Sequence, residues 1–388
     1  MSANNINFER KRPCTGCGAC AAVCTHNAIK FDFVNGFYKP TIDMLKCINC
    51  GLCKTVCYSH NNIEKQDKII AGYSGVHSSK KILKKCASGG ATYSISQFLL
   101  DNDYIVIGCG YNINSHTSEH IIINDKNKIG LISGSKYFQS NTFKIFETLN
   151  NMDRQSKMVL FGTPCQIYGF KKFFEIKKFN MDNIYFIELF CHGVTSPIIW
   201  KKYLESKAYY RNITNIIFRN KHYGWHIPCN TFVLSSGKQI HTKRRGDKFF
   251  DIFYSTKILN ESCYSCECKK TFGVADIRIG DFWGERYRSN KTGISCILSL
   301  TEKGDTLIKS LNDFENSAAD IDEILREQSY LRDHNIDTHI RDKILFGINN
   351  NNFKKIFKSF NSQFTKTQIF KKIICDSLSN LKNKILKK

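Results

Sequence analysis

A doubled cysteine pattern in the first sixty residues limits the folds open to this chain. The spacing C-x2-C-x2-C-x3-C occurs twice, first at Cys14, Cys17, Cys20 and Cys24, and again at Cys47, Cys50, Cys53 and Cys57. Three closely spaced thiolates surround one face of an iron–sulfur cubane, and the fourth, one helical turn on, reaches the neighbouring cubane. We therefore predict two [4Fe–4S] clusters, one held by Cys14, Cys17, Cys20 and Cys57, the other by Cys47, Cys50, Cys53 and Cys24.

The segment between the two cysteine runs has the pattern of a β-hairpin. Alternating residues in 28–43 flank Asn35-Gly36, a strong signal for a two-residue turn. The usual proline after each fourth cysteine is replaced by Thr25 and Tyr58. A zinc module is the alternative, but zinc sites pair C-x2-C knuckles and do not require this fourfold doubled spacing.

The charge and the two ends of the chain indicate its surroundings. Two clusters of charge −2 each lower the formal net charge of +23 to about +19, which still favours acidic partners, anionic cofactors, nucleic acid or a membrane surface. Eighteen cysteines without a secretory signal or a membrane-spanning stretch indicate metal binding in a cytoplasmic protein.

The remaining chain alternates strand and helix patterns. Buried strands are expected at 104–110, 158–165 and 183–193, a helix at 198–208 and a hairpin at 230–243. We predict an α+β protein with three parts: a bacterial-type ferredoxin module (1–66), a mixed α/β domain (67–345) and a basic amphipathic helical tail (346–388).

The tail has ten lysines and one acidic residue after position 350, with apolar residues at helical spacing. It is expected either to dock on a membrane surface or to pack on its own domain with a solvated lysine face.

A second group of cysteines lies at predicted strand ends and in loops. Thr163 and Pro164 have the pattern of an N-cap and first helical residue, which would place Cys165 at a helix N-terminus. The other members are Cys191, Cys263 and Cys266, with Cys268 as a rival thiol. Spacing alone does not join these residues, so a third cluster stays open at this point.

Six motifs follow one another behind the ferredoxin module, and together they resemble a known family. They are Ser88–Thr92, Gly134–Ser140, Gly162–Gln166, Phe190–Gly193, Ser196–Trp200 and Ala275–Gly284. The set resembles the beta subunits of coenzyme F420 hydrogenases and dehydrogenases over roughly residues 13 to 300.

The resemblance implies an FAD-binding domain with its own [4Fe–4S] cluster. The implied cluster ligands are Cys165, Cys191, Cys263 and Cys266, and the implied flavin-binding residues are Ser88, Gly89, Gly90, Thr92, Ser135, Lys136, Gly162 and Thr163. Glycines permit close backbone approach, hydroxyls bind phosphate and Lys136 supplies a cation. Ordinary turn chemistry is the alternative for these Gly/Ser runs.

Other candidates have weaker assignments. Asp281 either orients a donor at the site or ends a strand, while His192 is expected to be a structural hydrogen-bonding residue. The thiols of the remaining cysteines are expected to be buried or incidental. They are Cys86, Cys109, Cys229, Cys296 and Cys375.

We predict an iron–sulfur flavoprotein oxidoreductase in which FAD exchanges a hydride with coenzyme F420 or another small carrier, and [4Fe–4S] clusters exchange single electrons with a partner protein. The alternative is a non-catalytic electron-transfer subunit of a larger complex. Nucleic-acid binding is disfavoured because no interleaved basic and aromatic motif is present. No catalytic residue is assigned.

Overall fold

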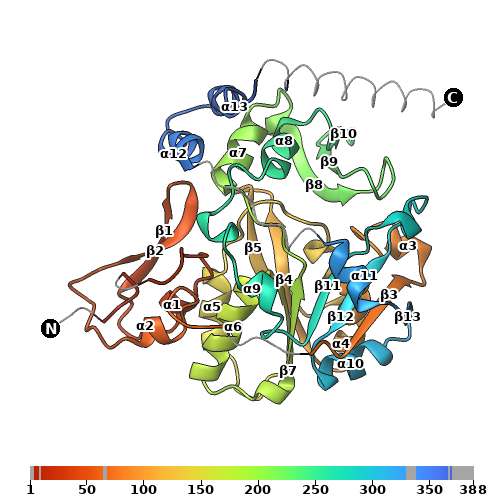
Figure 1. The fold of residues 1–388 in the computed structure, drawn as a ribbon, viewed down its shortest axis with the longest axis horizontal. Coiled ribbons are helices and arrows are strands. Elements are labelled where there is room, and N and C mark those ends of the chain that lie inside the picture. Colours follow the sequence, from red (N-terminus) through yellow and green to blue (C-terminus); the bar gives the residue numbers. More distant parts are fainter. Residues whose placement is uncertain (1–3, 8–9, 64–67, 329–337, 366–367, 369–388) are drawn as a thin grey trace.

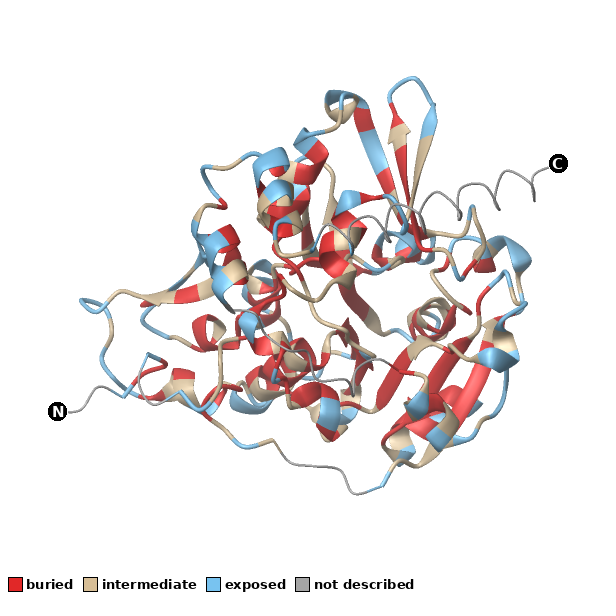
Figure 2. Ribbon diagram, turned by 45° about the horizontal axis from the view of Figure 1, so that its top comes forward, coloured by how far each residue is buried: buried red, intermediate tan, exposed pale blue. Residues whose placement is uncertain are grey.

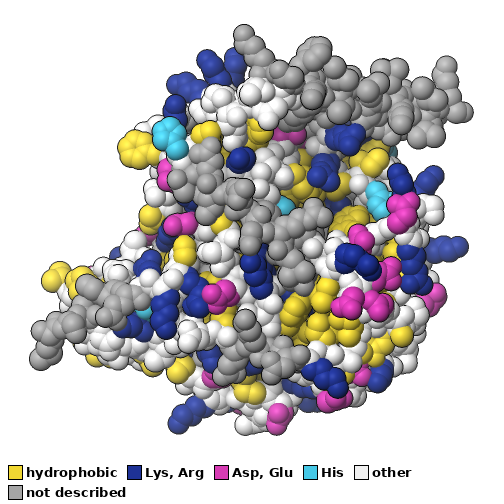
Figure 3. Space-filling view, in the orientation of Figure 1, with side chains coloured by type: hydrophobic (Ala, Val, Ile, Leu, Met, Phe, Trp, Pro, Cys, Tyr) yellow, Lys and Arg dark blue, Asp and Glu magenta, His cyan; other side chains and the backbone are white. Residues whose placement is uncertain are grey.

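The computed structural model describes residues 4–7, 10–63, 68–328, 338–365 and 368. A small module holds the N-terminal cysteine runs, a large sheet with helices on both faces forms the centre, and an upper lobe lies above it (Figure 1). Lys and Arg side chains are scattered over the face shown in Figure 3. Among the described residues, no helix combines the length and apolarity needed to cross a membrane.

The N-terminal module consists of two short helices and the predicted hairpin. Its elements are α1 Ala19–Ala22, β1 Ile29–Val34, β2 Phe37–Ile42 and α2 Leu52–Thr55. Val34 pairs with Phe37 across the turn, where Asn35 and Gly36 have φ angles of 49° and 78°. Positive φ at both positions defines the type I′ turn that matches the strand twist, so the predicted hairpin is confirmed.

The central sheet has eight strands in the order β13-β3-β12-β11-β7-β6-β4-β5. Their bounds are β3 Ala71–His77, β4 Ile105–Asn112, β5 Thr117–Ile123, β6 Met158–Gly162, β7 Ile184–Leu189, β11 Ile277–Asp281, β12 Ser295–Ser299 and β13 Phe314–Ala318. The four strands β4, β6, β7 and β11 run parallel, and the outer strands are antiparallel. Every residue of β6 is buried, as expected for a parallel strand covered on both faces (Figure 2).

Two hydrophobic cores lie on opposite faces of this sheet. On β6, Met158 and Leu160 belong to the core shared with the cysteine module, whereas Val159 and Phe161 belong to the other core. The helices of the first face are α5 Phe143–Asn150, α6 Pro164–Ile176 and α9 Cys268–Thr271, and those of the second are α4 Ala91–Leu100, η1 Lys126–Ile132 and α10 Glu302–Lys309. Shorter connecting elements are α3 Lys80–Leu83, η2 Met181–Asn183, η3 Tyr210–Asn212, η4 Glu261–Cys263, η5 Glu285–Tyr287 and α11 Ile321–Arg326.

The upper lobe has a core of its own, built around Trp200, Phe249 and Phe353. Its elements are α7 Pro197–Glu205, β8 Ile213–Asn220, β9 Cys229–Leu234, β10 Gln239–Lys243, α8 Lys248–Tyr254, α12 Thr338–Phe346 and α13 Phe353–Asn361. The helix α13 buries Phe353, Ile356 and Phe360 in this core, in agreement with the packing alternative for the tail. The prediction for residues 369–388 lies outside the described residues.

The cysteine module packs directly on the central domain. The Thr142 hydroxyl donates to the Cys17 carbonyl at 2.7 Å, and the Gln139 amide donates to the Thr15 and Tyr38 carbonyls. A Cβ added to Gly169, in the middle of α6, would lie 2.9 Å from the Cys17 sulfur. Only a residue without a side chain lets the helix and the cysteine loop approach this closely.

We expect Gly169→Ala to destabilise the protein. Alanine ordinarily stabilises a helix interior by about 0.5–1 kcal/mol relative to glycine, but here overpacking against Cys17 costs about 1–3 kcal/mol. Urea unfolding measures the change in the free energy of unfolding. Gly130→Ala is the matched control, because a Cβ at Gly130 meets no atom within 4 Å. Equal stability of the two variants would contradict the packing argument.

Candidate functional site

The first cysteine set surrounds a small cavity inside the N-terminal module. Cys14, Cys17, Cys20 and Cys57 all line this cavity, together with Tyr58. The Gly16 amide donates to the Cys14 sulfur at 3.4 Å, and Gly18, with φ 88°, turns the chain into α1. The structure thus brings together the four thiols predicted for one cluster.

The second set, Cys24, Cys47, Cys50 and Cys53, lines a separate cavity in the same module. Gly51, with φ 80°, turns the chain into α2 as Gly18 does into α1. The Ala28 amide donates to the Cys24 sulfur at 3.3 Å. Cys50 is exposed, so this cavity lies nearer to solvent than the first.

The third group, Cys165, Cys191, Cys263 and Cys266, lies on the wall of a larger cavity in the central domain. Cys165 follows β6 and Cys191 follows β7, so the two residues meet at the carboxyl ends of neighbouring parallel strands. The rival thiol, Cys268, is buried beside Cys266 but does not line the cavity. The geometry therefore separates the four resemblance-implied residues from the fifth.

The thiol environments fit an iron–sulfur cluster at each set. Among the described residues, no three His, Cys, Asp or Glu side chains converge on a point that one metal ion would occupy. Each set of thiols surrounds a cavity, as a multi-atom cluster requires. Burial raises the pKa of Cys17 and of Cys263 to about 12 each. Grouped buried thiolates therefore need compensating positive charge, which iron supplies.

The large cavity has a volume of about 240 Å³ and opens at the carboxyl ends of β6, β7 and β11. Crevices at this edge of parallel sheets are the usual ligand sites of α/β folds. Opposite the cysteines, its wall contains most of the residues implied for the flavin: Ser88, Gly90, Thr92, Ser135, Lys136, Gly162 and Thr163. Gly89 is not in this wall, because a Cβ there would contact the Gly75 carbonyl and the Ser295 amide.

The helix α6 presents two of these motifs to the cavity. Thr163 is its N-cap and Pro164 its first residue, as predicted, and the Thr163 amide donates to Gln166 Oε1 at 3.1 Å. Gln166 Nε2 donates to the Ser140 hydroxyl at 2.8 Å, which ties the Gly134–Ser140 motif to α6. These bonds fix the loop that carries Cys165 at the start of the helix.

Lys136 contributes a buried positive charge to the wall. Its ammonium group donates to the Cys109 and Ser133 carbonyls at 2.8 and 2.9 Å. Burial lowers the pKa of Lys136 to about 8. The small residues, hydroxyls and this cation fit a flat, anionic cofactor such as a flavin nucleotide. Cys86 and Cys109 also line the cavity, although no role was predicted for them.

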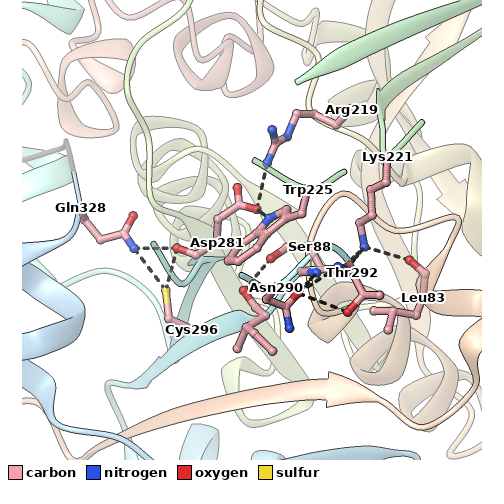
Figure 4. Close-up of polar contacts among 12 residues, drawn as sticks. Leu83, Ser88, Arg219, Lys221, Trp225, Asp281, Asn290, Thr292, Cys296 and Gln328 are labelled. Atoms are coloured by element: carbon pink, nitrogen blue, oxygen red, sulfur yellow. Dashed lines mark hydrogen bonds and ion pairs between the residues drawn. The ribbon is translucent and has the colours of Figure 1, made fainter. Parts of the chain in front are cut away.

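Asp281 lies at the cavity wall and at the end of β11 (Figure 4). One carboxylate oxygen accepts from Arg219 at 2.9 Å and from the Trp225 indole at 2.6 Å. The Trp225 and Trp283 rings stack 4.9 Å apart. Asp281 thereby fastens β8 of the upper lobe to the central sheet, which favours a positioning role for it.

Lys221 was not predicted from the sequence, and it fastens the Ser88 loop (Figure 4). Its ammonium group donates to the carbonyls of Leu83, Ser88 and Thr292. Burial lowers the pKa of Lys221 to about 8. A lone lysine whose partners are backbone carbonyls leaves no sequence motif, which explains why it was missed.

A buried ion pair supports the third cysteine loop. Arg278 Nε donates to Glu188 Oε1 at 2.6 Å, and its other nitrogens donate to the Lys269 and Cys268 carbonyls at 2.7 and 3.2 Å. Both charged side chains are at most 1% exposed. Burial raises the pKa of Glu188, and the charge of Arg278 opposes that rise. The His192 ring, 5.3 Å from that of Phe253, packs nearby as a structural residue.

The N-terminal match defines the class of protein. Residues 13–61 match the family of 4Fe-4S dicluster domains, which shows that the chain contains an iron–sulfur module. Residues 155–322 match the family described as the C terminus of the coenzyme F420 hydrogenase/dehydrogenase beta subunit. The chain therefore contains the C-terminal domain of this beta-subunit family behind a dicluster domain, which confirms the resemblance seen in the motifs.

Two curated relatives come from Methanocaldococcus jannaschii. The beta subunit of F420-dependent formate dehydrogenase is 25% identical over 32% of this chain and 33% of its own length. The iron-sulfur protein HdrA-type component of CoB–CoM heterodisulfide reductase is 45% identical over 13% of this chain and 11% of its own length. The matches thus span a third or less of these relatives. A chain of the F420-reducing [NiFe] hydrogenase complex from Methanosarcina barkeri is 16% identical, with a TM-score of 0.47 over 76% of this chain and 92% of that chain.

We expect Glu188→Gln to destabilise the protein by about 3–5 kcal/mol, because it leaves the Arg278 guanidinium buried without a counter-charge. Chemical denaturation of the purified protein measures the loss. The control is Glu285→Gln, which removes an ion pair to Arg288 that is about four-fifths exposed. We expect that control to change stability by no more than about 0.5 kcal/mol. A similar small effect at both positions would refute the structural role of the buried pair.

Proposed function

We propose that this chain is an iron–sulfur flavoprotein oxidoreductase that couples hydride transfer at FAD to single-electron transfer through three [4Fe–4S] clusters. The hydride donor or acceptor is coenzyme F420 or another small carrier. The observation that carries the proposal is the large cavity, whose wall contains four cysteines on one side and the Ser, Gly and Lys residues of the flavin motifs on the other. FAD in this cavity supplies exchange between two-electron and one-electron chemistry.

The residues of the chain hold and isolate the reacting groups. Gly90, Gly134 and Gly162 let a flat ring lie close to the backbone, and Lys136 provides positive charge beneath it. Cys165 and Cys191 place the third thiol set against the same cavity. The name of the formate dehydrogenase relative supports F420 as the carrier.

The second cysteine set is the proposed contact point for a partner protein. Its Cys50 is exposed, and the loop before it presents Met44, Leu45 and Ile48 at 53%, 100% and 60% exposure. Lys46 lies in the same loop, and the whole chain is strongly basic. Hydrophobic side chains are visible at this outer end of the module (Figure 3). An acidic one-electron carrier with an apolar contact patch fits this surface.

Metal and flavin content of anaerobically purified protein tests the proposed function. We expect about twelve Fe, twelve acid-labile sulfides and one FAD per chain. Cys266→Ser should lower the iron to about eight per chain, whereas Cys268→Ser should retain about twelve. About eight Fe and no flavin in the unaltered protein would sink the flavoenzyme proposal and leave a two-cluster electron-transfer protein.

Leu45→Asp tests the partner surface. It places a negative charge in an apolar patch, so electron exchange with a purified acidic two-cluster ferredoxin should slow by roughly tenfold. Exchange with methyl viologen, a small dye, should not change. Stopped-flow absorbance measures both rates. Phe346→Asp is the control, because Phe346 is also exposed (91%) but lies on α12. Equal slowing by both variants would exclude this loop as the specific contact.

A further inference from the structure

Tyr58 occupies the position after the fourth cysteine, where the ferredoxin pattern usually has proline. It is 2% exposed and directly follows Cys57 of the first set. Its hydroxyl accepts a hydrogen bond from the Glu267 amide at 2.9 Å. Glu267 is bonded to Cys266 of the third set. One side chain therefore connects a residue adjacent to a first-set thiol with a residue adjacent to a third-set thiol.

Arg12 reinforces this connection from the solvent side. Its Nη2 forms an ion pair with the Glu267 carboxylate at 2.7 Å. Its Nη1 donates to the carbonyls of Asn61 and Tyr58 at 2.9 and 3.4 Å, and the guanidinium lies 5.5 Å from the Tyr58 ring centre. Both Arg12 and Tyr58 belong to the N-terminal module, and both bind Glu267 of the central domain.

Tyr168 provides a comparison at the same junction. This α6 residue packs edge-on against the Tyr58 ring, with centroids 6.1 Å apart and an interplanar angle of 78°. Its hydroxyl is buried and has no hydrogen-bond partner within the described part of the chain. The two tyrosines share an environment, but only the Tyr58 hydroxyl contacts the third cysteine loop.

We propose that Tyr58 is a positioning residue that couples the first and third cysteine sets by holding the Cys263–Cys268 loop in its ligating geometry. A proline could make no such contact, because it has no hydroxyl to accept from Glu267. The replacement therefore suits a ferredoxin module that is permanently joined to a domain with its own thiol set. This inference rests on the proposed third cluster.

Tyr58→Phe in the anaerobically purified holoprotein tests the coupling, with Tyr168→Phe as the matched control. Hydrogen–deuterium exchange of the peptide that contains Glu267 reports the loop contact. Loss of one hydrogen bond should speed its exchange roughly tenfold in Tyr58→Phe and leave it unchanged in Tyr168→Phe. Iron release to a chelator reports the consequence. About four of twelve Fe should leave roughly tenfold faster in Tyr58→Phe only.

Arg12→Gln is a second variant in case Tyr58→Phe does not fold. It removes the ion pair with the partly exposed Glu267 and keeps the Tyr58 hydroxyl, so both rates should rise about two- to threefold. Twelve Fe in the unaltered protein with no difference between the tyrosine variants in either rate overturns the coupling alone. Eight Fe in the unaltered protein overturns the proposed third cluster and the coupling with it.

Discussion

The close approach between α6 and the first cysteine loop determines how the rest of the structure can be arranged. Gly169 allows the helix to touch Cys17, and Cys165 begins the same helix four residues earlier. Four residues of α-helix span about 6 Å, so the first and third thiol sets are linked by one helical turn. A rigid element of this kind keeps their spacing constant in a way that a flexible linker does not.

The N-terminal module was predictable because its information is local. Cysteine spacing within a dozen residues defines each loop, and Asn35-Gly36 defines the hairpin between them. The N-cap at Thr163 was equally readable, since a cap depends on the residue and its nearest neighbours. Convergence of the third cysteine group was not, because it depends on the order of β6, β7 and β11 in the sheet. Only the family resemblance indicated it beforehand.

Other features escaped prediction because their partners are backbone atoms or distant elements. The carbonyls that hold Lys221 come from residues more than 70 and 130 positions away, and carbonyls carry no sequence signature. The upper lobe combines α7 and α8 with α13, which lies about a hundred residues further along the chain. Periodicity predicted the helical character of α13 but not the surface that it covers.

Internal pairing also changes the meaning of the net charge. Arg219 and Arg278 form ion pairs with Asp281 and Glu188, and both guanidinium groups are buried. Lys136 and Lys221 direct their ammonium groups to backbone carbonyls. Part of the +23 count therefore serves to join loops and strands, and the charge that faces a partner is smaller than composition suggests.

The separation of the thiol sets along the chain has a consequence for biosynthesis. The first two sets are complete once Cys57 has been translated, whereas the third requires Cys266, which follows 209 residues later. At about 5–20 residues per second, that interval is roughly 10–40 s of ribosome time. The nascent chain thus exposes eight finished thiols long before their neighbours exist. Maturation of the N-terminal half is free to begin co-translationally, while the last metallation step must wait for the sheet to close.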